Sequence, residues 1–299
     1  MFDQKFKRTK KLHRTIEQNL ERRTVIVDDK LIKHKSIPLP SWIELSIIDV
    51  CNRNCVFCPK SDPKIAPDTY QKMSTILASK ISIELKEIGY NGSVTLCGYG
   101  EPMLHKEIYS IIKILAESSF VEIVTNGDTL KPQSIIDLYN SNANKLLISL
   151  YDGPEQIKKF KDIIKESGVP DEFVMLRDRW YDANEDYGLK LTNRSGTINV
   201  GQQEELNKYT FCNYPAYSLM IDWNGDVFLC PQDWQRRITM GNVMQQHIFD
   251  IWTGSAITKY RKNLLQGKRC DSPCKECNAE GTVLGNNHAK EWKKIFEKK

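Results

Sequence analysis

The chain has 299 residues, which is long enough for one large domain or for a large domain with a smaller one attached. Hydrophobic residues make up 40% of it and charged residues 27%, an ordinary balance for a protein with a sizeable core. No run of about 18 apolar residues occurs and the first residues lack the apolar segment of a signal peptide. We therefore expect neither a membrane span nor secretion, and predict a cytoplasmic location.

The formal net charge of +5 is concentrated near the N-terminus, where residues 1–35 hold eleven Lys or Arg and five Asp or Glu. The rest of the chain is close to neutral. A basic arm can bind an acidic partner, but a solvated surface helix is the simpler interpretation. We treat residues 1–40 as a basic N-terminal extension.

Strands and helices alternate after this extension. Apolar and β-branched runs predict strands over 41–50, 93–100, 121–127, 145–153 and 172–177. Helical spacing of apolar residues predicts helices over 72–90, 108–118, 132–142 and 155–168, the last ending at Gly168. This alternation is typical of a parallel α/β fold with right-handed crossovers.

The pattern changes after about residue 178. Residues 178–196 are polar and rich in turn formers. Asn224 and Gly225 separate two apolar runs within 217–230, which predicts a β-hairpin with a type I′ turn. A helical stretch over 247–265 follows, and then a cysteine-rich segment, "CDSPCKEC". This region has the composition of a small domain held together by metal.

Nine cysteines are an odd number, and in a cytosolic chain so many indicate metal binding or catalysis rather than disulfides. Three of them, Cys51, Cys55 and Cys58, lie within eight residues directly after the first strand. Zinc prefers four ligands, whereas three thiolates can hold three corners of a cubane iron–sulfur cluster and leave the fourth iron open.

The spacing in "CNRNCVFC" resembles the signature of the radical S-adenosylmethionine (radical SAM) enzymes. That resemblance implies that Phe57 lies beside the adenine of the cofactor. The later "GYGEP" resembles the Gly-Gly-Glu-Pro segment of this family, which implies that Gly98, Gly100 and Glu101 hold the methionine group of S-adenosylmethionine. A carboxylate suits an ammonium group, and glycine permits close backbone approach. Tyr99 departs from the small residue of the usual pattern.

Three polar residues lie at the ends of the third and fourth predicted strands: Thr125, Asn126 and Ser149. The resemblance implies that they contact the ribose and carboxylate of the cofactor. α/β barrels build their sites at this end of the strands. Ordinary turn chemistry is the alternative, because Asn-Gly and Asp-Gly pairs form turns.

The late cysteines resemble the auxiliary-cluster domain called SPASM, or Twitch in its shorter form. Cys212, Gly225 and Cys230 fit the start of its pattern. The resemblance implies a second [4Fe-4S] cluster with four cysteine ligands: Cys212, Cys230, Cys274 and Cys277. Cys270 remains over and is an alternative to Cys274. For Cys97, simple core packing is the expected role.

The resemblance as a whole implies a partial (β/α) barrel over 41–200, a SPASM/Twitch domain of β-hairpin and helix over 201–280, and a basic C-terminal helix over 281–299. It implies an oxidoreductase in which a 5′-deoxyadenosyl radical removes hydrogen from a carbinol carbon of a sugar or aminocyclitol. The auxiliary cluster then accepts the electron and a ketone forms. The same resemblance implies that Arg194, in "LTNRSG", lies at the substrate. The alternative is that Arg194 is a loop arginine that binds a carboxylate.

The expected partners are a small-molecule substrate and a reducing protein such as flavodoxin or ferredoxin, with no membrane and no nucleic acid. Three other functions stay open. An epimerase would use a thiol hydrogen donor, Cys97 or Cys270, and a maturase would modify a peptide. A zinc-stapled protein could bind RNA through its basic arm, but the aromatic residues that stack on bases are missing from that arm.

Overall fold

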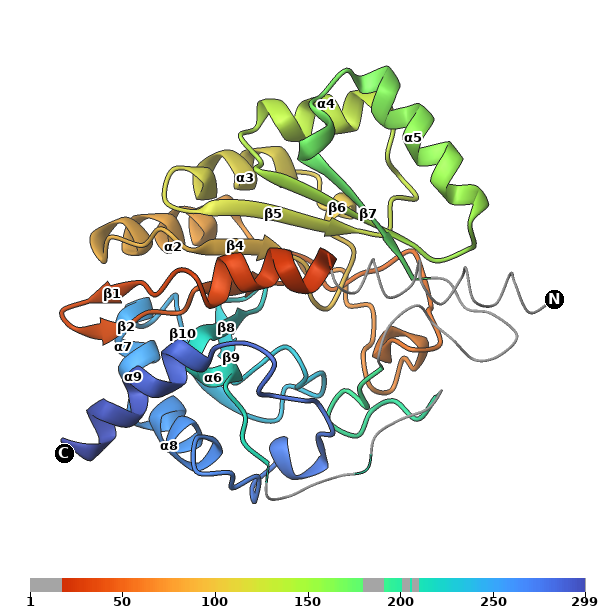
Figure 1. Cartoon of the computed structure of the whole chain (residues 1–299). Helices are drawn as coiled ribbons and strands as arrows, with labels where there is room; N and C mark the ends of the chain where they lie inside the picture. Colours follow the sequence, from red (N-terminus) through yellow and green to blue (C-terminus); the bar gives the residue numbers. More distant parts are fainter. Residues whose placement is uncertain (1–17, 180–190, 201–204, 206–209, 299) are drawn as a thin grey trace.

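A computed structural model describes residues 18–179, 191–200, 205 and 210–298 of the chain. In these residues the main sheet has eight strands in the order β10-β9-β8-β3-β4-β5-β6-β7 (Figure 1). The strands of this sheet are β3 (Trp42–Leu45), β4 (Ser93–Leu96), β5 (Phe120–Thr125), β6 (Lys145–Leu150), β7 (Val174–Asp178), β8 (Ser218–Ile221), β9 (Asp226–Phe228) and β10 (Thr239–Asn242). A short separate pair consists of β1 (Lys33–His34) and β2 (Ile37–Pro38).

The first half of the sheet is the parallel α/β unit that the sequence predicts. Strands β3 to β7 pair in parallel in chain order. The helices between them are α2 (Thr75–Glu87), α3 (Ile108–Ala116), α4 (Pro132–Asn140) and α5 (Glu155–Ser167). Helix α5 ends at Gly168, which adopts the left-handed conformation at φ 66°. The parallel α/β prediction is confirmed, and the carboxyl ends of β3 to β7 meet at one edge.

The two faces of this parallel unit differ sharply. Alternate residues of each strand point to opposite faces. One set is fully buried in the main hydrophobic core with the apolar sides of the helices: Ile43, Leu45, Val94, Leu96, Val121, Ile123, Leu146 and Ile148. The other set includes Glu44, Thr95 and Glu122, which lie side by side in register. We call this second, polar surface the inner face of the sheet.

The predicted hairpin exists, but its predicted turn type is wrong. Strands β8 and β9 pair antiparallel around Asn224 and Gly225. A type I′ turn needs positive φ at both central residues, and only Gly225 has it, at 89°. The Gly225 N–H donates to the carbonyl of Asp222, which makes a type I turn followed by a left-handed glycine. The Asn224 side chain bonds to Asp226 and supports this longer loop.

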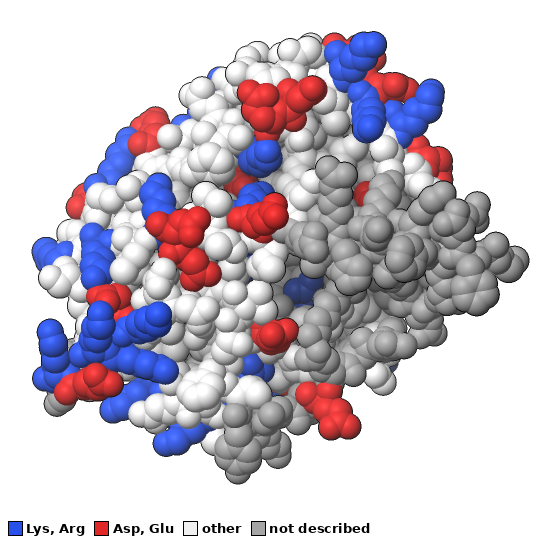
Figure 2. All heavy atoms as spheres, in the orientation of Figure 1, with Lys and Arg blue, Asp and Glu red and all other residues white. Residues whose placement is uncertain are grey.

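The C-terminal region extends the same sheet. Strand β8 pairs in parallel with β3, so the hairpin adds to the edge of the α/β unit. The helices of this region are α6 (Tyr214–Tyr217), α7 (Ile248–Thr253), α8 (Ser255–Leu264) and α9 (Asn286–Glu297), which lie below the sheet in Figure 1. Lys and Arg side chains gather over β1 and α9 (Figure 2), where Lys33 and Lys294 both pair with Glu291.

The helix expected near the N-terminus is present at residues 18–27, but one side of it is packed rather than solvated. It lies against the sheet (Figure 1). Its Arg22 forms an ion pair of 2.5 Å with Glu122, whose side chain is 1% exposed. The guanidinium of Arg23 lies 4.3 Å from the ring centre of Trp42. No helix among the described residues is both long enough and apolar enough to cross a membrane.

Candidate active site

The three early cysteines lie in the loop between β3 and a short 3-10 helix, Pro59–Ser61. The Cys58 N–H donates to the Cys55 carbonyl at 2.8 Å and closes a tight turn. Burial above all, together with charge on Cys58, raises the pKa of Cys51 to about 11 and that of Cys55 to about 12. The three sulfurs therefore lie within one electrostatic site, and a metal bound there has to displace thiol protons.

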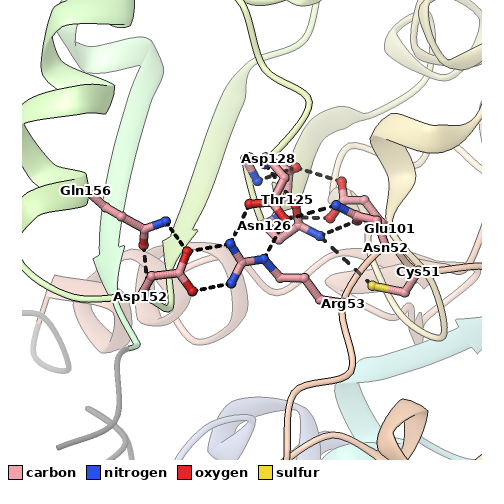
Figure 3. A network of polar contacts seen from close by, with 10 residues as sticks. Cys51, Asn52, Arg53, Glu101, Thr125, Asn126, Asp128, Asp152 and Gln156 are labelled. Carbon is pink, nitrogen blue, oxygen red and sulfur yellow. Dashed lines mark hydrogen bonds and ion pairs between the residues drawn. The ribbon is translucent and has the colours of Figure 1, made fainter.

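Arg53, between the first two cysteines, fastens this loop to the ends of two strands (Figure 3). Its guanidinium bonds both carboxylate oxygens of Asp128, at 2.5 and 2.6 Å, and both of Asp152, at 2.6 Å. Asp128 follows β5 and Asp152 follows β6. A planar guanidinium is suited to two such paired contacts. The clamp holds the cysteine loop over the carboxyl edge of the sheet.

Glu101 lies next to the clamp and is 4% exposed (Figure 3). Its carboxylate accepts hydrogen bonds from Thr125 Oγ1 at 2.6 Å, from the Asn126 N–H at 2.9 Å and from the Met103 N–H at 3.0 Å. Burial raises the pKa of Glu101, and these hydrogen bonds lower it. The amide of Asn126 in turn donates to Asn52 at 2.8 Å, within the cysteine loop. The structure thus brings Glu101, Thr125 and Asn126 together beside Cys51.

The glycines of "GYGEP" are required by close packing. Gly98 has φ 111°, where side chains are strained. A Cβ on Gly100 would lie 2.3 Å from the carbonyl oxygen of Ile48. These contacts press the glycine-rich loop against the chain that leads from β3 into the cysteine loop.

Ser149 and Phe57 lie on the side of the site formed by β6. Ser149 is 1% exposed and accepts a hydrogen bond of 2.7 Å from Arg177 on β7. The Phe57 ring lies 5.6 Å from that of Tyr151. Burial, together with the charge of Arg179, lowers the pKa of Arg177 to about 9.

Four late cysteines line one pocket, and they are the four selected from the sequence: Cys212, Cys230, Cys274 and Cys277. Burial first, and then the charges of the other three thiols, raise the pKa of Cys230 well above its usual range. Cys270 is exposed and is not part of this lining.

A buried cation lies at the same pocket. Arg269 is 4% exposed, lines the pocket and donates to four backbone carbonyls, those of Thr210, Phe211, Cys277 and Ala279. Its charge lowers the pKa of Cys212, although burial raises that pKa overall to about 11. A positive charge held here by neutral carbonyls favours thiolate ligands.

Arg194 belongs to a turn next to this pocket. The turn is strained, since Arg194 and Ser195 both have positive φ, at 46° and 54°. Ser195 lines the four-cysteine pocket. On the other side, the charge of Arg194 lowers the pKa of Cys58, which burial raises. The turn therefore lies between the two groups of cysteines.

Both groups offer only cysteine sulfur as a donor, which suits iron–sulfur clusters. Across the part of the chain that the structure describes, no three Cys, His, Asp or Glu side chains converge as ligands of a single metal ion do.

Two family profiles match the chain. One, the radical SAM superfamily, matches residues 45–179, and the other, an iron–sulfur cluster-binding domain called SPASM, matches residues 212–278. The S-adenosyl-L-methionine-dependent 2-deoxy-scyllo-inosamine dehydrogenase of Niallia circulans is 30% identical over 244 residues, which are 80% of this chain and 92% of that protein. The chain belongs to the radical SAM superfamily.

Solved structures agree with this membership. The crystal structure of BtrN with AdoMet and 2-DOIA superposes with a TM-score of 0.68 at 25% identity, covering 85% of this chain and 98% of that one. SuiB of Streptococcus suis, bound to its precursor peptide SuiA, shares the fold with a TM-score of 0.56 at 15% identity, covering 80% of this chain and 70% of that one. The protein is a radical SAM enzyme with an auxiliary-cluster domain, and its cofactors are S-adenosylmethionine and two iron–sulfur clusters.

Three arginines of the site were missed from the sequence. Arg53 had a signal, since it lies in the cysteine motif while Asp128 and Asp152 follow strands. Arg177 and Arg269 had none, because only folding places them beside Ser149 and the late cysteines. The segments 180–190, 201–204 and 206–209 lie outside the described residues.

Proposed function

We propose that this enzyme oxidises a secondary alcohol of an aminocyclitol, or of a closely related amino sugar, to a ketone. The observation that carries the proposal is the position of the Arg194 turn between the two groups of cysteines. A substrate held at Arg194 would lie between the two clusters that this proposal assigns to those cysteines. The similar dehydrogenase of Niallia circulans is named for oxidation of 2-deoxy-scyllo-inosamine.

Each predicted site residue receives a role in this proposal. Cys51, Cys55 and Cys58 would hold the first [4Fe-4S] cluster, and three ligands would leave room for S-adenosylmethionine to bind it. Cys212, Cys230, Cys274 and Cys277 would hold the second cluster, beside the positive charge of Arg269. When bound, S-adenosylmethionine and the clusters supply the radical that removes hydrogen and the acceptor of the remaining electron.

The other residues bind and orient S-adenosylmethionine. Gly98 and Gly100 let the backbone approach the methionine group, and Glu101 offers its carboxylate to the ammonium. Thr125 and Asn126 hold Glu101 in place and line the ribose side. Ser149, with Arg177, offers a hydroxyl and a cation to the carboxylate, and Phe57 packs on the adenine. Arg194 donates hydrogen bonds to the substrate hydroxyls.

The domain limits stay a prediction: a partial barrel over 41–200 and a SPASM/Twitch domain over 201–280. A flavodoxin or ferredoxin is the proposed electron donor. Its contribution is testable by replacing a chemical reductant with either protein in the assay below.

The test is anaerobic incubation of the reconstituted enzyme with S-adenosylmethionine, a reductant and 2-deoxy-scyllo-inosamine. We expect 5′-deoxyadenosine and a product lighter by two hydrogens, as judged by mass spectrometry. A Cys230→Ala variant should retain cleavage of S-adenosylmethionine but lose the ketone. A product of unchanged mass that carries deuterium from heavy water would contradict oxidation and identify an epimerase.

A further inference from the structure

The inner face of the sheet carries two carboxylates in one row, and their surroundings differ. Glu122 is saturated: Arg22 lies 2.5 Å from both of its oxygens, and the hydroxyls of Ser93 and Thr95 lie at 3.5 and 3.3 Å. Glu44 accepts a single hydrogen bond within the described residues, from the thiol of Cys97 at 3.3 Å. A thiol is a weak donor. Glu44 thus keeps accepting capacity that Glu122 has used.

Unpartnered donors lie on or against the inner face that carries Glu44. The Nε of Arg23, the Nε1 of Trp42 and the Nε of Arg177 are buried and have no hydrogen-bond partner among the described residues. Arg23 stacks on Trp42 at 4.3 Å, and its charge lowers the pKa of Glu44, which burial raises. Buried polar groups without partners are rare in folded proteins. Donors and one open acceptor together suit a ring with several hydroxyl groups, because each hydroxyl both donates and accepts.

Glu44 lies on the inner face next to Cys97, and charges from both sides of the site act on it. The positive charge of Arg194 lowers the pKa of Glu44 and also that of Cys58, so Arg194 interacts electrostatically with both groups. On the opposite side, Arg23 interacts with the Tyr214 side chain, and Tyr214 lines the four-cysteine pocket. Through Cys97 Glu44 contacts the end of β4, which leads into the glycine-rich loop, and through Arg23 it is linked to Tyr214 of the four-cysteine pocket.

We propose that Glu44 binds the reacting hydroxyl of the substrate and takes up its proton, with Arg23 of the N-terminal helix holding the carboxylate in position. This inference rests on the proposed function. Oxidation of a carbinol to a ketone removes a hydrogen atom, an electron and a proton. The cofactors account for the first two, and the O–H proton moves to a Glu44 carboxylate oxygen while its bonding pair stays on the substrate oxygen. An arginine is a poor base at its ordinary pKa, so Arg194 cannot easily fill this role.

The experiment compares the unaltered enzyme with Glu44→Gln, which keeps the shape of the side chain but not its basicity. Ketone formation from 2-deoxy-scyllo-inosamine should fall by about 100-fold or more. Formation of 5′-deoxyadenosine should continue, so that cleavage becomes uncoupled from oxidation. Glu44→Asp keeps a carboxylate but shortens the side chain, so its ketone formation should fall less than that of Glu44→Gln. Glu122→Gln is the matched control on the same face, and its ratio of ketone to 5′-deoxyadenosine should stay that of the unaltered enzyme.

A second measurement does not depend on turnover. Calorimetric binding of 2-deoxy-scyllo-inosamine should weaken by about tenfold or more in Glu44→Gln, in line with the loss of a charged hydrogen bond. Glu122→Gln should bind it as the unaltered protein does. The melting temperature of each variant reports whether the fold is retained.

The possible results separate the two proposals. Ketone formation by Glu44→Gln within about threefold of the unaltered rate would overturn the role of Glu44 and leave the oxidation intact. Binding that depends on Glu44 without any ketone from the unaltered enzyme would refute the oxidation and retain the binding role. Absence of binding by the unaltered protein would refute both.

Discussion

Tyr99 is expected to fasten the glycine-rich loop of the S-adenosylmethionine site to the auxiliary domain. It is 2% exposed, and its hydroxyl donates to the carbonyl of Asp233 at 3.0 Å. Its ring makes edge contacts with Trp234 at 4.9 Å and Phe228 at 6.3 Å, and the guanidinium of Arg236 lies 4.3 Å from its centre. The residue that departs from the small residue of the family pattern therefore packs against the auxiliary domain and adds to the β3–β8 pairing that joins the two halves.

The magnitudes follow from these contacts. Tyr99→Ala removes a buried ring and leaves a cavity, which should lower the free energy of unfolding by about 3–5 kcal/mol. Tyr99→Phe removes only the hydroxyl and leaves the carbonyl of Asp233 without that donor, which should cost about 1–2 kcal/mol. Tyr70→Phe is the control, because Tyr70 is 75% exposed and its hydroxyl should contribute almost nothing.

The functional consequence is measured together with stability. Thermal unfolding gives the loss of stability for each variant, and the anaerobic assay gives the ratio of ketone to 5′-deoxyadenosine. Tyr99→Phe keeps the packing of the ring but removes its hydrogen bond to the auxiliary domain. We therefore expect a lower ratio of ketone to 5′-deoxyadenosine at a temperature where the variant is fully folded. If Tyr99→Phe matches the unaltered protein in both stability and ratio, Tyr99 does not hold the two halves together.

Three further predictions concern other parts of the molecule. Cys274→Ala should lower the iron content from about eight to about four per chain, and Cys270→Ala should leave it unchanged, as iron analysis after reconstitution would show; equal loss in both would mean that Cys270 is a ligand. Arg22→Ala leaves the buried carboxylate of Glu122 unpaired and should lower the free energy of unfolding by about 3–5 kcal/mol in urea, whereas a change near zero would mean that the N-terminal helix is not part of the folded core. Burial lowers the pKa of His288 from 6.5 to about 4, so the unfolded state binds more protons between these values and stability should fall by about 3 kcal/mol as the pH drops through this range. His288→Gln should abolish that contribution to the pH dependence, and an unchanged profile would contradict it.

The local sequence determined the elements and the chemistry of the metal sites. Apolar spacing placed α2 to α5 and β3 to β7 correctly, because one face of each is buried in the same core. The cysteine spacing indicated an iron–sulfur cluster because Cys51, Cys55 and Cys58 share one short loop. The residues that determine each helix or strand, and those that determine the first cluster site, are close together in the chain.

Only the tertiary structure decided which distant side chains meet. Arg53 pairs with Asp128 and Asp152, and Arg22 pairs with Glu122, so both ion-pair groups join residues from separate elements. The fold also leaves Cys270 outside the four-cysteine pocket. Neither composition nor periodicity encodes such pairs, because they depend on the register of strands and on the packing of the N-terminal helix on the inner face. From the sequence alone the basic N-terminal segment is expected to be solvated. The fold shows otherwise, because it places the buried carboxylate of Glu122 beside Arg22.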